Sequence, residues 1–235
     1  MKILIINKRM MTYILMAILV IIVVGTLYYF YNRVDETFNM DIYYKGNVED
    51  KIVSFACNVD WGNEYIEPML EIFERANIRI TFFVTGTWAE KYPELLKTIY
   101  NAGHEIGNHG YRHIDYDKLS YDNNREEILK AHNVIYNIIG EEPNFFAPPS
   151  GAYNDNTIKA AKDLNYDIIM WSIDTIDWRD DSTRDKIINR VTSKIHKSAI
   201  VLMHPTKETV SALPEIIEYL INKGYKIGRI SDVVK

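Results

Sequence analysis

The stretch IVSFACNVDWGNEYIEPMLEIFERANIRITFFVT, residues 52–85, decides the fold class. It opens on a β-rich run at 52–57, and a second such run, RITFFVT, follows at 79–85. Between them, residues 64–77 place apolar side chains at helical spacing. This order of strand, helix and strand predicts two parallel strands joined by a helical crossover.

The same alternation continues to the end of the chain and predicts about seven strands. A closed or nearly closed α/β barrel fits that number better than an open doubly wound sheet, and either architecture places its chemistry at the carboxyl ends of the strands. Further strands are expected at 104–106, 144–147, 166–171, 198–203 and 225–230, and helices at 88–102, 122–139, 157–165, after Ser182 or Thr183, and at 213–223.

Composition limits the classes of protein that need consideration. The chain has 235 residues, of which 47% are apolar, so one large domain with a substantial core is expected. A formal charge of −5 argues against nucleic acid as the main partner. The single cysteine, Cys57, excludes an intrachain disulfide.

The N-terminal segment differs from the rest. Between Arg9 and Arg33 lie 23 uncharged residues, enough to cross a bilayer as a helix. A cleaved signal peptide is the alternative, but the small residues of a cleavage site are lacking. We therefore expect a short cytoplasmic segment and transmembrane anchor at 1–33, a tether at 34–48 and an outer domain at 49–235. Residues 1–33 carry +4, which leaves −9 for the remainder.

Polar side chains follow several of the expected strands. If the first strand persists, Asn58 and Asp60 point the same way, although an aspartate after a strand is more often a turn or cap residue. His109 and His113 stand at i and i+4, which is a spacing suited to a metal such as zinc. Two histidines and one carboxylate leave open positions on the metal for water and substrate.

Two later segments complete this set. The stretch APPSGAY, residues 147–153, is stiffened by prolines and can wall a pocket or present backbone N–H groups. His204 directly follows the strand SAIVLM and is a candidate general acid, which a carboxylate such as Asp174 can hold in orientation. The remaining histidines, His104, His132 and His196, are interpreted as structural or surface residues.

From Lys51 onward, these segments resemble the polysaccharide deacetylases, also called carbohydrate esterase family 4 or the NodB homology domain. GHEIGNHGYRH, residues 103–113, resembles the family's H-x-x-x-H metal motif. APPSGAY is similar to its R-x-P-x-G motif, WSIDTIDW at 171–178 to the motif whose aspartate supports the acid, and LMH at 202–204 to the motif that ends in the acid itself.

The resemblance implies a distorted (β/α)7 barrel of NodB-homology type after one transmembrane helix. It also implies hydrolysis of N-acetyl groups by a divalent metal, zinc or cobalt or another transition metal, with His204 protonating the leaving amine. The implied site consists of the metal ligands Asp60, His109 and His113, the catalytic residues His204, Asp174 and Asn58, and the substrate-binding residues Pro149, Ser150 and Trp178.

Two positions depart from the family pattern. The first motif usually reads T-F-D-D-G, with the first aspartate as base, and Asn58 stands at that position. Some branches write the aspartate pair as D-x-D, in which Asp60 fits as the metal ligand. The arginine of R-x-P-x-G, which braces the base, is Ala147 here. An amide has no basic site near neutral pH, so base and brace are missing together.

Three functions follow as hypotheses. The first is a membrane-anchored, metal-dependent hydrolase that removes N-acetyl groups from N-acetylglucosamine-type units of peptidoglycan or a chitin-like wall glycan. The second is a catalytically impaired glycan-binding protein of the same fold, and the third a hydrolase of another non-peptide C–N bond. For the chain we expect a single-pass protein of the cell membrane, with its N-terminus cytoplasmic and its C-terminal domain extracytoplasmic. We also expect a glycan substrate and no nucleic acid as partner; the oligomeric state is left open.

Overall fold

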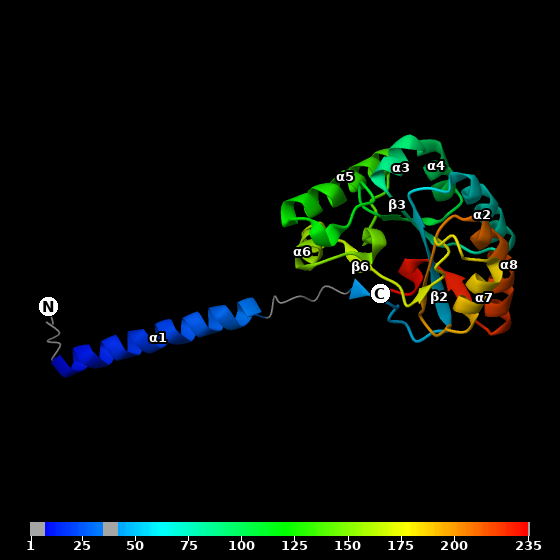
Figure 1. The fold of residues 1–235 in the computed structure, drawn as a ribbon. Helices are drawn as coiled ribbons and strands as arrows, with labels where there is room; N and C mark the ends of the chain where they lie inside the picture. The colour runs from blue at the N-terminus through cyan, green and yellow to red at the C-terminus, as the bar shows by residue number, and fades with distance from the viewer. Residues whose placement is uncertain (1–7, 35–41, 235) are drawn as a thin grey trace. The chain divides into compact units, whose positions relative to one another are not determined.

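The computed structural model describes residues 8–34 and 42–234 (Figure 1). The chain divides between Asn39 and Met40 into two compact units. The helices are α1 (Lys8–Val34), α2 (Asn63–Arg75), α3 (Gly86–Lys91), α4 (Pro93–Asn101), α5 (Tyr121–Ile139), α6 (Asp155–Asp163), α7 (Arg184–Thr192) and α8 (Lys207–Asn222). The strands are β1 (Ile42–Tyr43), β2 (Ile52–Val59), β3 (Thr81–Val84), β4 (Glu105–Asn108), β5 (Phe145–Phe146), β6 (Asp167–Ile169), β7 (Ile173–Asp174), β8 (Ile200–Met203) and β9 (Lys226–Gly228).

The first unit contains helix α1, which has 27 residues. Its stretch Arg9–Thr26 has a mean hydropathy of 2.1, and none of that stretch is buried. By length and composition this helix suits a membrane span, and a signal sequence near the N-terminus satisfies the same criteria.

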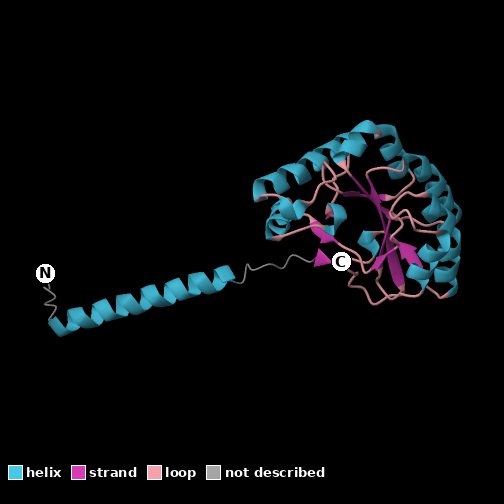
Figure 2. Cartoon of the chain, in the orientation of Figure 1, coloured by secondary structure: helices cyan, strands magenta, loops and turns pink. Residues whose placement is uncertain are grey.

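The second unit is built on one parallel sheet, in the order β1-β6-β5-β4-β3-β2-β8-β7, with β9 also paired to β2. Strand β2 pairs with three neighbours and seven of its eight residues, IVSFACNV, are buried; all but Asn58 are small or apolar, as a central parallel strand requires. The sheet curls, and helices lie around its outer face (Figure 2). The predicted α/β fold of the NodB-homology type is confirmed.

The curled sheet remains a half-barrel among the described residues, since its end strands β1 and β7 do not pair with each other. The segment that follows β1 lies across the opening, with an antiparallel bridge between Lys45 and Ala199 and a hydrogen bond from Gly46 N to Ser198 O. Residues 42–47, expected in a tether, therefore belong to the folded unit.

Proline explains one difference between the expected and observed helices. The helix expected at 88–102 is two helices, α3 and α4, because Pro93 lacks a backbone N–H and begins the second one. The helix expected at 213–223 already begins at Lys207, where the side chain of Thr206 caps it by accepting from Thr209 N.

Strand alternation separates two apolar layers. Phe55, Cys57 and Val59 of β2 face outward into the main core beneath the helices. Ala56 faces inward, where it joins a smaller cluster with Phe83 and with the buried Ala147. Asn58 is in phase with Ala56, so its side chain is directed toward the inner side at the carboxyl end of β2.

Candidate functional site

A cavity of about 430 Å³ opens at the carboxyl ends of the strands. Side chains from β2, β7 and β8, and from the segments that follow β2, β4, β5, β6, β7 and β8, form its wall, as expected for a parallel α/β fold. Its lining residues are Asn58, Trp61, His113, Ser150, Trp171, Asp174, Trp178, Leu202 and His204.

Asn58 occupies the penultimate position of β2 and is 5% exposed. Its Oδ1 atom is buried and has no hydrogen-bond partner among the described residues. A buried polar atom without a partner costs about 1–3 kcal/mol, so its retention in a cavity wall is typical of a site that meets a ligand. The amide cannot take up a proton, and this position therefore supplies no general base.

Asp60, predicted as a metal ligand on the same side as Asn58, lies elsewhere. Strand β2 ends at Val59, and Gly62 with φ +80° turns the chain, so alternation does not extend to Asp60. Its Oδ1 accepts a 2.7 Å hydrogen bond from the hydroxyl of Thr85, and Asp60 does not line the cavity. In the structure Asp60 therefore contacts Thr85, the N-cap residue of α3, and not the cavity.

His109 and His113 do come together, with ring centroids 5.3 Å apart. The segment between them is a loop with Gly110 at φ +77°, so the pair is formed by a turn and not by a helix face. His109 Nδ1–H donates to the carbonyl of Ala147 at 2.7 Å, which leaves Nε2 as the nitrogen with a lone pair. Burial, and then the neighbouring His113, lower the pKa of His109 to about 3.

The family's metal requires more than this pair. Within the described residues, no group of three His, Cys, Asp or Glu side chains converges on one point. A catalytic zinc site uses three protein ligands and an open position, and here two histidines are present while the expected carboxylate contacts Thr85. The predicted triad of Asp60, His109 and His113 is therefore not assembled.

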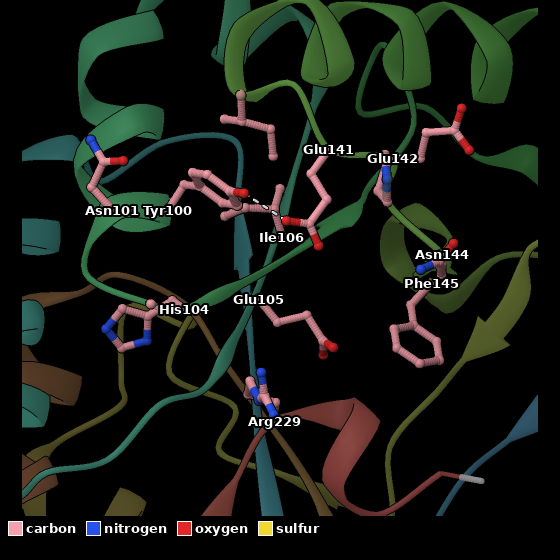
Figure 3. Close-up of a pocket in the computed structure, with 13 residues that line it drawn as sticks. Tyr100, Asn101, His104, Glu105, Ile106, Glu141, Glu142, Asn144, Phe145 and Arg229 are labelled. Carbon is pink, nitrogen blue, oxygen red and sulfur yellow. Dashed lines mark hydrogen bonds between the residues drawn. The ribbon is translucent and has the colours of Figure 1, made fainter.

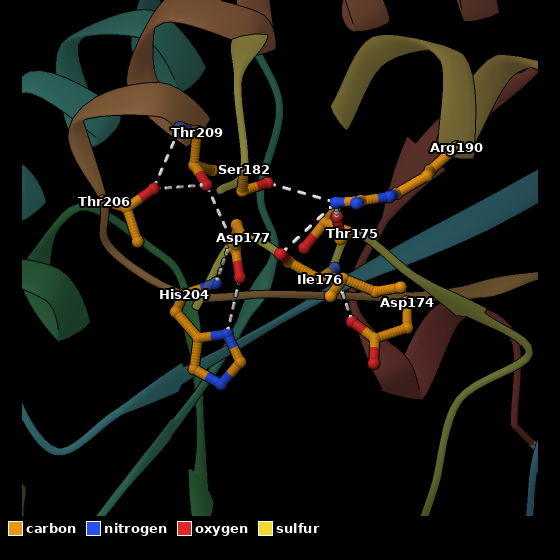
Figure 4. A network of polar contacts seen from close by, with 9 residues as sticks. All are labelled: Asp174, Thr175, Ile176, Asp177, Ser182, Arg190, His204, Thr206 and Thr209. Carbon is orange, nitrogen blue, oxygen red and sulfur yellow. Dashed lines mark hydrogen bonds and ion pairs between the residues drawn. The ribbon is translucent and has the colours of Figure 1, made fainter. Parts of the chain in front are cut away.

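The prediction that Asp174 orients His204 was wrong: Asp177 holds His204 instead (Figure 4). Its Nδ1–H donates to Asp177 Oδ1 at 2.8 Å, and its backbone N–H donates to Oδ2 at 2.7 Å. The hydroxyl of Thr209 adds a third donor at 2.6 Å. This arrangement fixes the ring and directs Nε2 away from Asp177, as a general acid at the cavity wall requires.

The loop between the two aspartates explains the exchange of roles. Ile176 has φ +51°, a left-handed conformation that is unfavourable for a β-branched residue, and it reverses the chain after β7. Its N–H donates to Asp174 Oδ1 at 2.7 Å. Arg190 Nη1 holds the loop through the carbonyls of Thr175 and Ile176 (2.6 and 3.3 Å). Sequence spacing alone does not reveal such a reversal.

The predicted substrate-binding residues are only partly in place. Ser150 and Trp178 line the cavity, whereas Pro149 is buried and does not line it. Ser150 has φ +56°, which marks this loop as strained. The prediction missed Trp61, whose ring stacks on that of His204 with centroids 5.8 Å apart and an interplanar angle of 5°. It also missed Trp171 and Leu202. The available signal was their position, at the end of the strand predicted at 166–171 and within the strand predicted at 198–203.

A second cavity, of about 450 Å³, lies at the opposite end of the strands (Figure 3). Glu105, the first residue of β4, lines it together with Glu141 and Arg229. His104 also borders it and serves a structural role, because its Nδ1 accepts from Ile80 N at 3.1 Å. Burial, together with the charge of Arg79, lowers the pKa of His104 to about 4.

Comparison with known proteins defines the class. The family model described as polysaccharide deacetylase matches residues 45–169. The uncharacterized protein YlxY of Bacillus subtilis is 40% identical over 191 residues, which cover 81% of this chain and 60% of that protein. A peptidoglycan-N-acetylglucosamine deacetylase of Bacillus cereus is 36% identical and covers 68% of this chain and 60% of its own. The chain thus spans about 60% of the length of these two relatives.

A solved structure adds a different kind of relative. The pseudoenzyme BA3943 of carbohydrate esterase family 4, from Bacillus anthracis, matches with a TM-score of 0.81 and 38% identity, over 85% of this chain and 71% of that one. A mutant of BA3943 is described as having restored enzymatic activity. The present chain belongs to the polysaccharide deacetylase family.

Proposed function

We propose that this chain is a catalytically impaired member of the polysaccharide deacetylase family that binds cell-wall glycan. The observation that carries the proposal is Asn58, a buried amide with an unpartnered Oδ1 at the position where the family resemblance places the base. The similarity to a family 4 pseudoenzyme supports it.

Aromatic side chains favour glycan as the ligand. Trp61 and Trp178 line the cavity and remain 44% and 55% exposed, and Trp171 lies beside them. Exposed tryptophans present flat apolar faces, which suit the C–H faces of sugar rings, while each indole N–H can meet a hydroxyl. A partly apolar cavity with a few polar groups is the usual form of a small-ligand site.

In this proposal the metal site has two protein ligands and not three. His109 and His113 provide two imidazoles, and His109 already has the Nδ1 hydrogen bond that orients a metal-binding histidine. A third protein ligand is missing among the described residues, so we expect a divalent cation to bind weakly. No step of the chemistry is assigned to it.

We further propose that α1 anchors the chain in the cell membrane. Its apolar length supports this, as does the basic flank of Lys2, Lys8 and Arg9, which favours a cytoplasmic N-terminus. The glycan-binding unit would then lie outside the membrane, beside the wall. This placement follows from the charge rule and the family's glycan.

The second candidate function is residual deacetylation, and one observation favours it. His204 and Asp177 retain the geometry of a general acid with its supporting carboxylate. Hydrolysis would place water on the acetyl carbon, break the C–N bond and transfer a proton from His204 Nε2 to the departing amine. Without a base at position 58, we expect a rate lower by the factor that general bases provide, about 10²–10⁴.

One experiment on the full-length chain in detergent tests both functions. Binding of N-acetylglucosamine tetramer and peptidoglycan fragments is measured by calorimetry, and acetate release from both is measured with added zinc. Binding without detectable acetate release supports the proposal. Slow acetate release, about 10²–10⁴-fold below the ~10 s⁻¹ typical of enzymes, would replace it with the second candidate. Release at about 10 s⁻¹ would contradict both, and absence of binding would reject the proposal.

Two variants separate specific binding from surface adhesion. Trp178→Ala removes an aromatic face from the cavity and should weaken glycan binding at least tenfold. Tyr136→Ala removes a comparably exposed aromatic side chain, 46% exposed, from α5 outside the cavity and should leave binding unchanged.

A further inference from the structure

We propose that the cavity prefers amino sugars whose amine is free, so that this chain binds glycan from which the acetyl group has already been removed. This inference rests on the proposed glycan-binding function and names the chemical form of its ligand. Asp174 and the surrounding tryptophans are the features from which it follows.

Asp174 is the one carboxylate among the nine residues that line the cavity. Its Oδ1 accepts from Ile176 N at 2.7 Å, which fixes the side chain at the end of β7 (Figure 4). Its Oδ2 has no hydrogen bond within the described part of the chain. A fixed carboxylate oxygen that faces a cavity is a charge-assisted acceptor for an ammonium group.

No cation forms an ion pair with Asp174 among the described residues. Arg190 directs its Nη1 to the carbonyls of Thr175 and Ile176 and to Ser182 Oγ. Asp177 adds a second carboxylate close by, behind His204. Burial and then Asp177 raise the pKa of Asp174, while the Ile176 N–H, His204 and Arg190 lower it. The free carboxylate oxygen of Asp174 is therefore the group at this wall that an ammonium would meet.

The rest of the wall suits the same ligand. A cation near an indole face gains about 0.5–2 kcal/mol, and Trp61, Trp171 and Trp178 offer such faces around the cavity. Asn58 adds an amide oxygen without a partner, which can accept a hydrogen bond from an ammonium or a hydroxyl. An N-acetyl group has no charge to place against Asp174, so a free amine gains the larger interaction.

Calorimetry of the full-length chain in detergent at pH 6.5 tests the inference, with glucosamine tetramer and N-acetylglucosamine tetramer as the two probes. We expect the glucosamine tetramer to bind at least tenfold more tightly, and this preference to shrink as salt rises from 50 to 500 mM, roughly as screening requires. In Asp174→Asn, which keeps an acceptor for Ile176 N–H, the preference should fall to within about twofold. Asp117→Asn, an exposed carboxylate outside the cavity, is the matched control.

The outcomes distinguish the preference for free amines from the proposed glycan binding itself. Equal binding of the two tetramers, or an unchanged preference in Asp174→Asn, overturns the preference for free amines and leaves glycan binding intact. Failure of both tetramers to bind overturns glycan binding as well. A preference for the glucosamine tetramer that is lost in Asp174→Asn and kept in Asp117→Asn supports the inference.

Discussion

His109 donates its Nδ1–H to the backbone carbonyl of Ala147 at 2.7 Å, so the residue at the brace position of the family motif also orients the first histidine of the metal motif. The contact uses the backbone, and it therefore persists whichever side chain stands at 147. What the chain lacks at this position is a side-chain charge. The histidine pair is thus in place although Asn58 and Ala147 stand where the family resemblance expects base and brace.

Restoring the base should restore part of the chemistry. Asn58→Asp places a carboxylate on the wall of the cavity, which His113 and His204 also line. The new carboxylate can serve as a base, or as a third metal ligand beside His109 and His113. We expect acetate release with zinc to rise at least tenfold, since general bases contribute about 10²–10⁴-fold. Acetate assays on the full-length chain, with zinc affinity measured in parallel, check this expectation.

The control for that variant is Asn58→Asp combined with His204→Ala, which keeps the new carboxylate and removes the acid. Activity that survives in the double variant would mean that His204 is not the acid. Tighter zinc binding without acetate release would identify the missing brace as the limiting part.

Asp177 and Asp174 should differ sharply in their contribution to stability. Asp177→Asn removes one acceptor oxygen from a buried carboxylate that serves three donors, so the free energy of unfolding should fall by about 3 kcal/mol. Asp174→Asn keeps the contact with Ile176 N and should change the free energy of unfolding by less than about 1 kcal/mol. Urea unfolding of both variants measures the difference. Equal effects would contradict the assignment of Asp177 as the partner of His204.

His104 should make stability dependent on pH. Its pKa falls from an ordinary 6.5 to about 4 because the ring is buried and lies near Arg79. Above pH 6.5 the ring is neutral in both states; between 6.5 and 4 only the unfolded chain takes up the proton, so folding is progressively disfavoured. The loss amounts to on the order of 3 kcal/mol by pH 4.

His104→Asn isolates that contribution, since its amide oxygen can accept from Ile80 N in place of Nδ1. Urea unfolding at pH 8, 6, 5 and 4 should show the wild-type advantage shrinking as the pH falls. A constant difference between the two proteins at all four pH values would show that His104 is protonated to the same extent in both states.

The sequence predicted well what periodicity controls and poorly what single turns control. Alternation placed the strands, and the order of motifs identified the family. It failed at Asp60, because the strand stops one residue earlier, and at Asp174, because the left-handed Ile176 reverses the chain. Such turns depend on tertiary contacts, here those of Thr85 and Arg190, which local spacing does not encode.

Reintroducing the brace tests whether base and brace are energetically coupled. Ala147 is 4% exposed and packs in the inner cluster beside Phe83, so Ala147→Arg alone should lower the free energy of unfolding by about 1–3 kcal/mol or more through overpacking and an unpaired charge. Asn58→Asp alone also introduces an unpaired buried charge. Together the two new charges can pair, and the double variant should be more stable than the sum of the single effects by about 1–3 kcal/mol.

Urea unfolding of wild type, both single variants and the double variant measures that coupling. Ala152→Arg, in the same loop but only half-buried and outside the inner cluster, controls for added charge and should show no coupling with Asn58→Asp. Positive coupling with a gain in acetate release over Asn58→Asp alone would show that the site accommodates the base and brace that the family resemblance implies. If the two effects on the free energy of unfolding are simply additive, the new arginine at 147 does not reach the new carboxylate at 58. The inner cluster packed around Ala147 would then exclude the arginine side chain from the cavity.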